Sequence, residues 1–287
     1  MASERKRIER IVEHHRREAE EEYYREVGDD ATYDQITWEN IEPFLPRHGW
    51  ILDAGGGAGV WSRKMIETSK CSVALLDITG ELLKTAKKRI RKDMLGERIE
   101  VLQGDIRSLP HPDVSFEFVL SEADPISICG DPDKAVNELS RVLKPNCHFV
   151  AGVDSTFYRA FHMLSQGKSL NHVLNFLQNG MSLAEETAKF NSKSFTPTEL
   201  ISLLQKHGLK TVRIVGKPID LSTNMLDVFV TALPAEKRRK IFENKAEKEK
   251  LKQMLTEIYK DTYIAGIGSH LQVVAVKKRK VASSPHM

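Results

Sequence analysis

The 287-residue chain has little of what marks several large protein classes. Its three cysteines, Cys71, Cys129 and Cys147, are too few and too widely spaced for a disulfide framework or a zinc module. No apolar run approaches the roughly 20 residues of a membrane-spanning helix. The charged N-terminus lacks the apolar segment of a secretory signal. We therefore expect a cytoplasmic protein with reduced thiols and no membrane partner.

Excess charge is also missing. The chain has 43 Lys and Arg against 40 Asp and Glu, a formal net charge of +3. Such a balance has no electrostatic signature of nucleic-acid binding. The basic run at 277–280 is interpreted as part of a solvated C-terminus, followed by a flexible tail at 281–287. The length allows one α/β domain with insertions.

Apolar segments and helical segments alternate through the first half of the chain. Strands are expected at 50–53, 72–77, 98–103, 116–121 and 148–153, and helices at 59–68, 80–93 and 131–143. This alternation predicts a parallel sheet covered by helices on both faces. A helix opened by a capping box at Thr196 and Glu199 and strands at 211–215 and 270–276 continue the α/β core.

Helical additions interrupt this core. Amphipathic spacing at 5–27 and a second short helix at 32–46 predict an N-terminal helical lid over 1–46. The cofactor-binding core is assigned to 47–154 and a helical cap insertion to 155–196. Residues 197–280 then complete the core, with a second helical insertion at about 222–268.

The segment I-L-D-A-G-G-G-A-G at 51–59 places glycines directly after the first strand. A dinucleotide fingerprint needs a third small residue where this chain has Val60. The spacing that fits is Gly55, Gly57 and Gly59 after Asp53. An acid at the strand end with a tight turn favours a ligand with an amino group over a pyrophosphate.

Two more acids end the next strands. Asp77 stands where an acid binds both ribose hydroxyls, and Asp105 could accept from an adenine amino group. Ile78 and Ile106, which follow these acids, belong to the same expected cofactor-binding set. Three acids at successive strand ends describe a pocket for a cationic adenosine, namely S-adenosylmethionine.

Four segments in this order resemble the class I S-adenosylmethionine-dependent methyltransferases: D-A-G-G-G-A-G, L-L-D, G-D-I-R-S-L-P-H-P-D-V-S-F-E-F-V and L-S-R-V-L-K-P-N. Within that superfamily they are closest in style to the branch that methylates quinone precursors and sterols. The resemblance implies a Rossmann-like α/β fold with seven strands, the last antiparallel, and S-adenosylhomocysteine as product. The family often has a glycine pair where this chain has Asn146-Cys147, and Phe where it has His111.

Other side chains are candidates for the methyl acceptor. Glu122 and Asp124 follow the fourth strand, where they could hold the acceptor or take its proton, or else cap the next helix. Glu122 is also placed in the cofactor-binding set. Tyr24, Tyr33 and Trp38 could close over a sulfonium or simply pack on the domain. His111 is a candidate at the pocket mouth or a polar loop residue, and no motif predicts a metal site.

These observations predict an enzyme that transfers a methyl group by in-line displacement to a small molecule. One alternative is a methyltransferase that acts on a protein or RNA docked on the helical insertions. Another is a non-catalytic regulator that binds S-adenosylmethionine. A nicotinamide enzyme fits least, because Val60 breaks the dinucleotide fingerprint.

Overall fold

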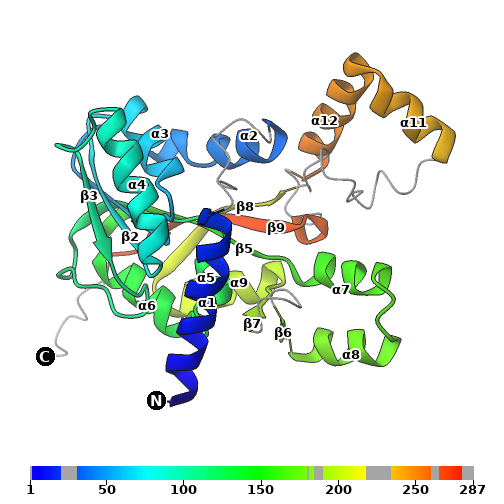
Figure 1. Ribbon diagram of the computed structural model, residues 1–287, viewed down its shortest axis with the longest axis horizontal. Coiled ribbons are helices and arrows are strands. Elements are labelled where there is room, and N and C mark those ends of the chain that lie inside the picture. The colour runs from blue at the N-terminus through cyan, green and yellow to red at the C-terminus, as the bar shows by residue number, and fades with distance from the viewer. Residues whose placement is uncertain are drawn as a thin grey trace, which may run out of the picture.

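Seven strands form one mixed sheet at the centre of the molecule (Figure 1). The computed structural model describes residues 2–20, 31–179, 181–183, 190–217, 234–259 and 265–279. The strand order is β3-β2-β1-β4-β5-β9-β8, and β9 runs antiparallel to both of its neighbours. In chain order the strands are β1 (Trp50–Ala54), β2 (Ser72–Asp77), β3 (Ile99–Gln103), β4 (Phe116–Ser121), β5 (Leu143–Asp154), β8 (Leu209–Lys217) and β9 (His270–Lys277). This arrangement confirms the predicted fold class.

Helices follow the strands as the alternating pattern predicts. The helices of the core are α3 (Val60–Thr68), α4 (Gly80–Lys92), α5 (Pro125–Ile128), α6 (Pro132–Val142) and α9 (Pro197–Lys206). The N-terminal part contributes α1 (Ala2–Glu20), α2 (Ala31–Glu39) and the 3-10 helix η1 (Glu42–Phe44). The insertions contribute α7 (Thr156–Ser165), α8 (Leu170–Asn179), α11 (Ala235–Glu243), α12 (Lys245–Tyr259) and the 3-10 helix η2 (Ala265–Ile267).

The sheet separates two apolar layers, because successive side chains of a strand point to opposite faces. Ile51 packs in the layer that contains Met65 of α3 and Ala86 of α4. Leu52, the next residue, packs in the layer that contains Leu139 of α6 and Leu204 of α9. Buried on both faces, the central strands are nearly continuous apolar runs, as parallel strands must be.

The insertion after β5 differs from the predicted cap in one respect. Helices α7 and α8 are present, but β6 (Met181–Leu183) pairs antiparallel with β7 (Asn191–Lys193). Residues 155–190 are therefore not helical throughout. Ser192 donates from its hydroxyl to a carboxylate oxygen of Asp154 at 2.5 Å, which ties β7 to the end of β5.

One local prediction is confirmed in detail. Thr196 accepts a hydrogen bond from the Glu199 amide at 3.2 Å, and the Glu199 carboxylate accepts from the Thr196 amide at 2.8 Å, so the capping box is complete. Asn146 has a φ of 61°, a left-handed conformation that asparagine tolerates better than most residues.

Candidate functional site

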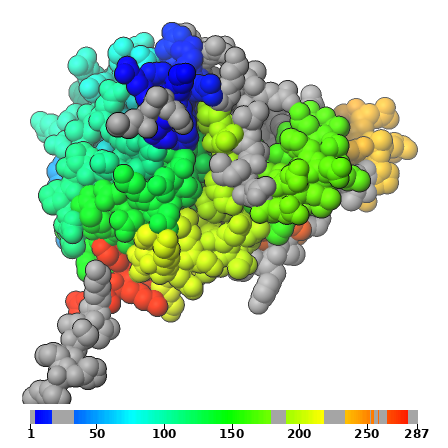
Figure 2. All heavy atoms as spheres, turned by 90° about the horizontal axis from the view of Figure 1, so that it is seen from below, coloured from blue at the N-terminus to red at the C-terminus, as the bar shows by residue number. Residues whose placement is uncertain are grey.

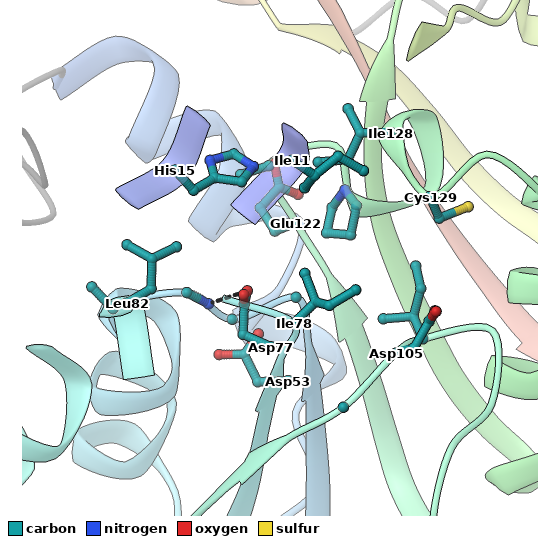
Figure 3. A pocket seen from close by; sticks show the side chains of 18 of the residues that line it. Ile11, His15, Asp53, Asp77, Ile78, Leu82, Asp105, Glu122, Ile128 and Cys129 are labelled. Atoms are coloured by element: carbon teal, nitrogen blue, oxygen red, sulfur yellow. Dashed lines mark hydrogen bonds between the residues drawn. The ribbon is translucent and has the colours of Figure 1, made fainter. Parts of the chain in front are cut away.

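A cavity of about 330 Å³ opens at the carboxyl ends of β1, β2 and β4. Its floor is the glycine turn after β1, and α1 lies across it with Ile11 and His15 directed inward (Figure 3). Most of its lining is apolar or main chain, and Asp53, Asp77, Asp105 and Glu122 supply carboxylates. Crevices at this edge of an open α/β sheet are where such folds bind ligands.

The glycine turn is a conformational requirement of the fold. Gly55, Gly57 and Gly59 have φ angles of 81°, 50° and 77°, in the region that side chains other than glycine avoid. A Cβ on Gly55 would collide with the Pro125 ring. A Cβ on Gly56 would lie 2.7 Å from the Asp53 carboxyl carbon. The turn therefore brings bare main chain to the cavity, and Gly55 and Gly57 line it, whereas Gly59 begins α3.

Asp53 lies beneath this turn and is almost completely buried. Its carboxylate accepts a hydrogen bond from the Ser62 hydroxyl at 2.6 Å. Burial raises the pKa of Asp53 to about 7, and the Ser62 hydrogen bond offsets only part of that effect. A cationic group in the cavity would relieve the cost of keeping this carboxylate charged.

Asp77, at the end of β2, is held by main-chain donors. Its carboxylate accepts from the Gly57 amide at 3.0 Å, drawn as a dashed line in Figure 3, and from the Thr79 amide at 2.7 Å. Burial raises the pKa of Asp77, while these two hydrogen bonds counteract it. A carboxylate has about four acceptor sites, so two remain for hydroxyl groups of a ligand.

Asp105 lines the cavity in an ion pair. The Arg107 guanidinium donates to both of its oxygens, with contacts of 2.6 to 3.1 Å, and also pairs with Glu4 of α1. Although burial raises the pKa of Asp105, the hydrogen bonds from Arg107 bring it below its ordinary value. Arg107 thereby connects the third acid to α1.

Glu122, after β4, is neutralised by a buried lysine. The Lys217 ammonium at the end of β8 contacts one oxygen of the Glu122 carboxylate, and the Gln272 amide donates to the other at 3.0 Å. The Lys217 side chain has no exposed surface, and its ammonium lies 4.0 Å from the centre of the Tyr33 ring. Glu122 thus lines the cavity as one half of an ion pair.

Asp124 pairs with an imidazole. His270, at the start of β9, places Nε2 at 3.0 Å from the Asp124 carboxylate and 3.9 Å from that of Asp154. Burial works to raise the pKa of Asp124, but the charge of His270 and its hydrogen bond bring it below the ordinary value. Burial likewise works to lower the pKa of His270, and Asp124 raises it above the ordinary value. One ligand atom of each of the three residues lies within 4.8 Å of the others.

The remaining candidates from the sequence fall in different places. Ile78, Ile106 and Tyr33 line the cavity. Trp38 stacks on Trp61 of α3, with 6.3 Å between ring centroids, and packs with the apolar layer of α3 and α4.

His111 packs edge-on against Phe116 at 4.9 Å, and it is absent from the lining of this cavity, as is Trp38. Tyr24 lies outside the described residues. Burial lowers the pKa of His111.

Sequence analysis missed Asp154, Lys217 and His270. Asp154 directly follows the predicted fifth strand, and an acid at a strand end could have marked it as a site residue. His270 begins the antiparallel strand, so its N-terminal end meets the carboxyl ends of the parallel strands, opposite both Asp154 and Lys217 in register. Placing it there requires the complete strand order, which local patterns do not contain.

Comparison with known proteins agrees with this geometry. Residues 51–146 match the family described as methyltransferase domain. The chain is 32% identical over 117 residues to the ubiquinone/menaquinone biosynthesis C-methyltransferase UbiE of Bartonella henselae. That match covers 40% of this chain and 44% of UbiE, so the chain spans less than half the length of this curated relative.

Solved structures share the fold at low sequence identity. An S-adenosylmethionine-dependent methyltransferase of Methanosarcina mazei has a TM-score of 0.57 and 20% identity, over 84% of this chain and 97% of that one. Geranyl diphosphate methyltransferase, solved in complex with S-adenosylmethionine, has a TM-score of 0.53 and 12% identity, over 85% and 84%.

The glycine turn and the acids after β1 and β2 lie within the segment that matches the methyltransferase domain. Bare main chain and a doubly held ribose-type acid fit the cofactor that members of that family share. Residues 51–146 thus match a methyltransferase domain, and the chain has the fold of solved S-adenosylmethionine-dependent methyltransferases.

Proposed function

We propose that this protein transfers a methyl group from S-adenosylmethionine to a small molecule. The observation that carries the proposal is the buried Asp77, fixed by the Gly57 and Thr79 amides beside a turn without side chains. UbiE of Bartonella henselae is named a C-methyltransferase of ubiquinone and menaquinone biosynthesis. That likeness supports a small-molecule acceptor and makes carbon a candidate for the methylated atom.

The cofactor would be held by the residues predicted for it. Main chain at Gly55 and Gly57 would adjoin its methionyl part, and Asp53 would face its ammonium group. Asp77 would bind the ribose hydroxyls, and Ile78 and Ile106 would contact the adenine on its two sides. Asp105 is already paired with Arg107, so an adenine amino group would share that carboxylate with the guanidinium.

The bound cofactor supplies a methyl group already activated by its sulfonium, and the protein's residues orient the acceptor and manage its proton. The negative charge of Glu122 is balanced by Lys217, and this suits Glu122 to positioning the acceptor. Asp124 holds His270 by Nε2 at 3.0 Å, and the His270 side chain is 28% exposed. We infer that this pair takes the acceptor's proton. Neither residue lines the cavity, but Tyr33, which does, packs edge-on against the imidazole at 5.5 Å.

Helix α1 would act as the lid over this reaction. Arg7, Ile8, Ile11 and His15 line the cavity from α1. Arg7 also donates to the main-chain oxygen of Cys129 at 2.5 Å, and Glu4 pairs with Arg107, so two polar contacts dock the helix. Deleting residues 2–20 should speed dissociation of S-adenosylhomocysteine in stopped-flow measurements. An unchanged dissociation rate would contradict a lid.

Isothermal titration calorimetry tests the cofactor. Purified protein should bind S-adenosylhomocysteine and not NAD. Asp77→Ala should weaken S-adenosylhomocysteine binding at least about tenfold, because it removes charge-assisted hydrogen bonds of about 1.5–3 kcal/mol each. Asp113→Ala, at an acid that is 73% exposed, is the matched control and should leave the affinity for S-adenosylhomocysteine unchanged. NAD binding in place of S-adenosylhomocysteine would overturn the proposal.

Transfer of a radiolabelled methyl group tests the acceptor. The proposal expects the label in the small-molecule fraction of a cell extract. Label in the protein or RNA fraction would favour docking of a macromolecule on the helical insertions. Binding of S-adenosylhomocysteine without any transfer would favour a regulator.

A further inference from the structure

Helices α7 and α8 form a hairpin that projects from the core at the right of Figure 1. Their contact is narrow: Ala160 and Met163 of α7 pack against Val173 and Phe176 of α8. The four-residue connection at 166–169 turns the chain back, so the helices run antiparallel, as Figure 1 shows. Only one stripe of each helix is used by this contact.

A second stripe on each helix is apolar and open to solvent. The exposed fractions are 51% for Phe161, 71% for Leu170 and 55% for Leu174, and Phe157, Leu164 and Leu177 are each exposed by 40% or more. On α7 these residues occupy positions i, i+4 and i+7, and the same spacing repeats on α8. Each set therefore forms a single face of its helix.

The two stripes fall on the same side of the hairpin. On both helices the exposed stripe is rotated by about 100° from the inner stripe, in the same sense along the chain. Because the helices are antiparallel and face each other, equal rotations bring both stripes to one side. The six residues define one surface, which we call the hairpin face: Phe157, Phe161, Leu164, Leu170, Leu174 and Leu177. An exposed apolar surface of this kind marks an interaction site.

Charge indicates what this surface would meet. Residues 156–179 contain no Asp or Glu and two cations: Lys168, between the two helices, and Arg159, which interacts electrostatically with Asp124 and Asp154. Helices α11 and α12 hold eight Lys and Arg against five Glu, and α11 and the hairpin lie toward the same end of the molecule, α11 above and the hairpin below in Figure 1 and both at the right in Figure 2. The summed net charge of the hairpin and of helices α11 and α12 is larger than the +3 of the whole chain. The rest of the chain is therefore net negative.

We propose that the hairpin face docks the protein on an anionic lipid surface. Each helix has ten residues, about 15 Å, which is half the thickness of a bilayer core, so the hairpin would lie in the interface. Apolar side chains on one face and a net positive charge are the features of interfacial helices. Among the described residues no helix has the length and apolar character needed to cross a membrane, which agrees with surface attachment.

Vesicle cosedimentation tests the proposal with the full chain. The protein should sediment with vesicles of phosphatidylcholine containing 30 mol% phosphatidylglycerol and much less with pure phosphatidylcholine, and binding should weaken at 0.5 M salt. Phe161→Glu/Leu174→Glu should lower the partition coefficient at least about tenfold, since acids replace two apolar side chains that docking would bury in the lipid. Met94→Glu, at a residue that is 89% exposed and lies outside the hairpin, should bind as the unaltered protein does.

Circular dichroism and S-adenosylhomocysteine binding check that each variant is folded. Absence of binding to anionic vesicles would overturn the proposal, as would equal binding by the double variant or equal binding to both vesicle types. A dimer in light scattering that the double variant converts to a monomer, without vesicle binding, would assign the face to a second copy of the chain. None of these outcomes bears on methyl transfer, which the calorimetry above tests separately.

Discussion

Buried carboxylates line both sides of the crevice, yet they are held in different ways. On the glycine-turn side, which comprises Asp53, Asp77 and the turn from Gly55 to Gly59, the acids accept hydrogen bonds from neutral donors nearby in sequence. The ion-pair side comprises Glu122, which lines the cavity, and Asp124, Asp154, Lys217 and His270, which do not. Its acids meet cations from chain segments about 100 residues away or more.

The two modes of support suit different tasks. Neutral donors leave the net negative charge in place, so the glycine-turn side favours a cation. Opposite charges on the ion-pair side cancel in part, and a proton that moves between the Asp124 carboxylate and the His270 imidazole leaves the net charge unchanged. We infer that the first side selects the cofactor and the second prepares the acceptor.

Removal of Lys217 should give the largest effect. Lys217→Met leaves Glu122 buried without its cation, and we expect the free energy of unfolding to fall by about 3–5 kcal/mol in urea denaturation. The double variant Lys217→Met/Glu122→Gln should recover most of this loss. Lys206→Met, which breaks an exposed pair with Asp133, should cost no more than about 1 kcal/mol. If Lys217→Met and Lys206→Met lowered the free energy of unfolding equally, burial would not make the Lys217–Glu122 pair more important to stability than an exposed pair.

Asp53 should make cofactor affinity depend on pH. With a pKa of about 7, it is protonated in the free protein at lower pH, while a cationic ammonium favours its ionised form. Affinity for S-adenosylhomocysteine should rise from pH 5 to 7 by up to about tenfold per pH unit and then level off. Stability of the free protein should fall over the same range, because the folded state binds more protons than the unfolded state.

Calorimetry in buffers of different ionisation enthalpy would detect the proton released on binding. Asp53→Asn should abolish both the release and the pH dependence. A flat affinity profile for the unaltered protein would place the ammonium elsewhere.

His270 should give a smaller, local effect. Its pKa is raised by Asp124, so its ring should titrate above the ordinary histidine range in NMR, and Asp124→Asn should lower the midpoint. Asp154, Lys217, Glu122 and Arg159 are the other charges around this pair. The stabilisation is complete below the ordinary histidine pKa and is lost as pH rises through the raised value.

His162 of α7, whose pKa burial lowers, is the internal control and should not respond to Asp124→Asn. A His270 midpoint that Asp124→Asn leaves unchanged would remove the basis for a proton-accepting pair. Binding of S-adenosylhomocysteine should persist in His270→Gln, which separates this role from that of the cofactor site.

The same contrast explains how far sequence analysis reached. The glycine turn, Asp53 and Asp77 lie within 25 residues of one another, and their chemistry follows from strand ends and glycine spacing alone. Trp38 shows the opposite case, since an aromatic residue on a cover helix suits either a lid or packing. Its stacking on Trp61 depends on how α2 approaches α3.

The sequence by itself determined the alternation of strands and helices, the left-handed glycine turn and the acids beside it, because these depend on local backbone preferences. Only the tertiary structure brought Lys217 to Glu122 and His270 to Asp124. Those pairs form because β9 enters the sheet antiparallel between β5 and β8, which sets the start of one strand against the ends of two others. Which distant strands pair in this way depends on the burial of the whole sheet, and the pattern of a short segment does not predict it.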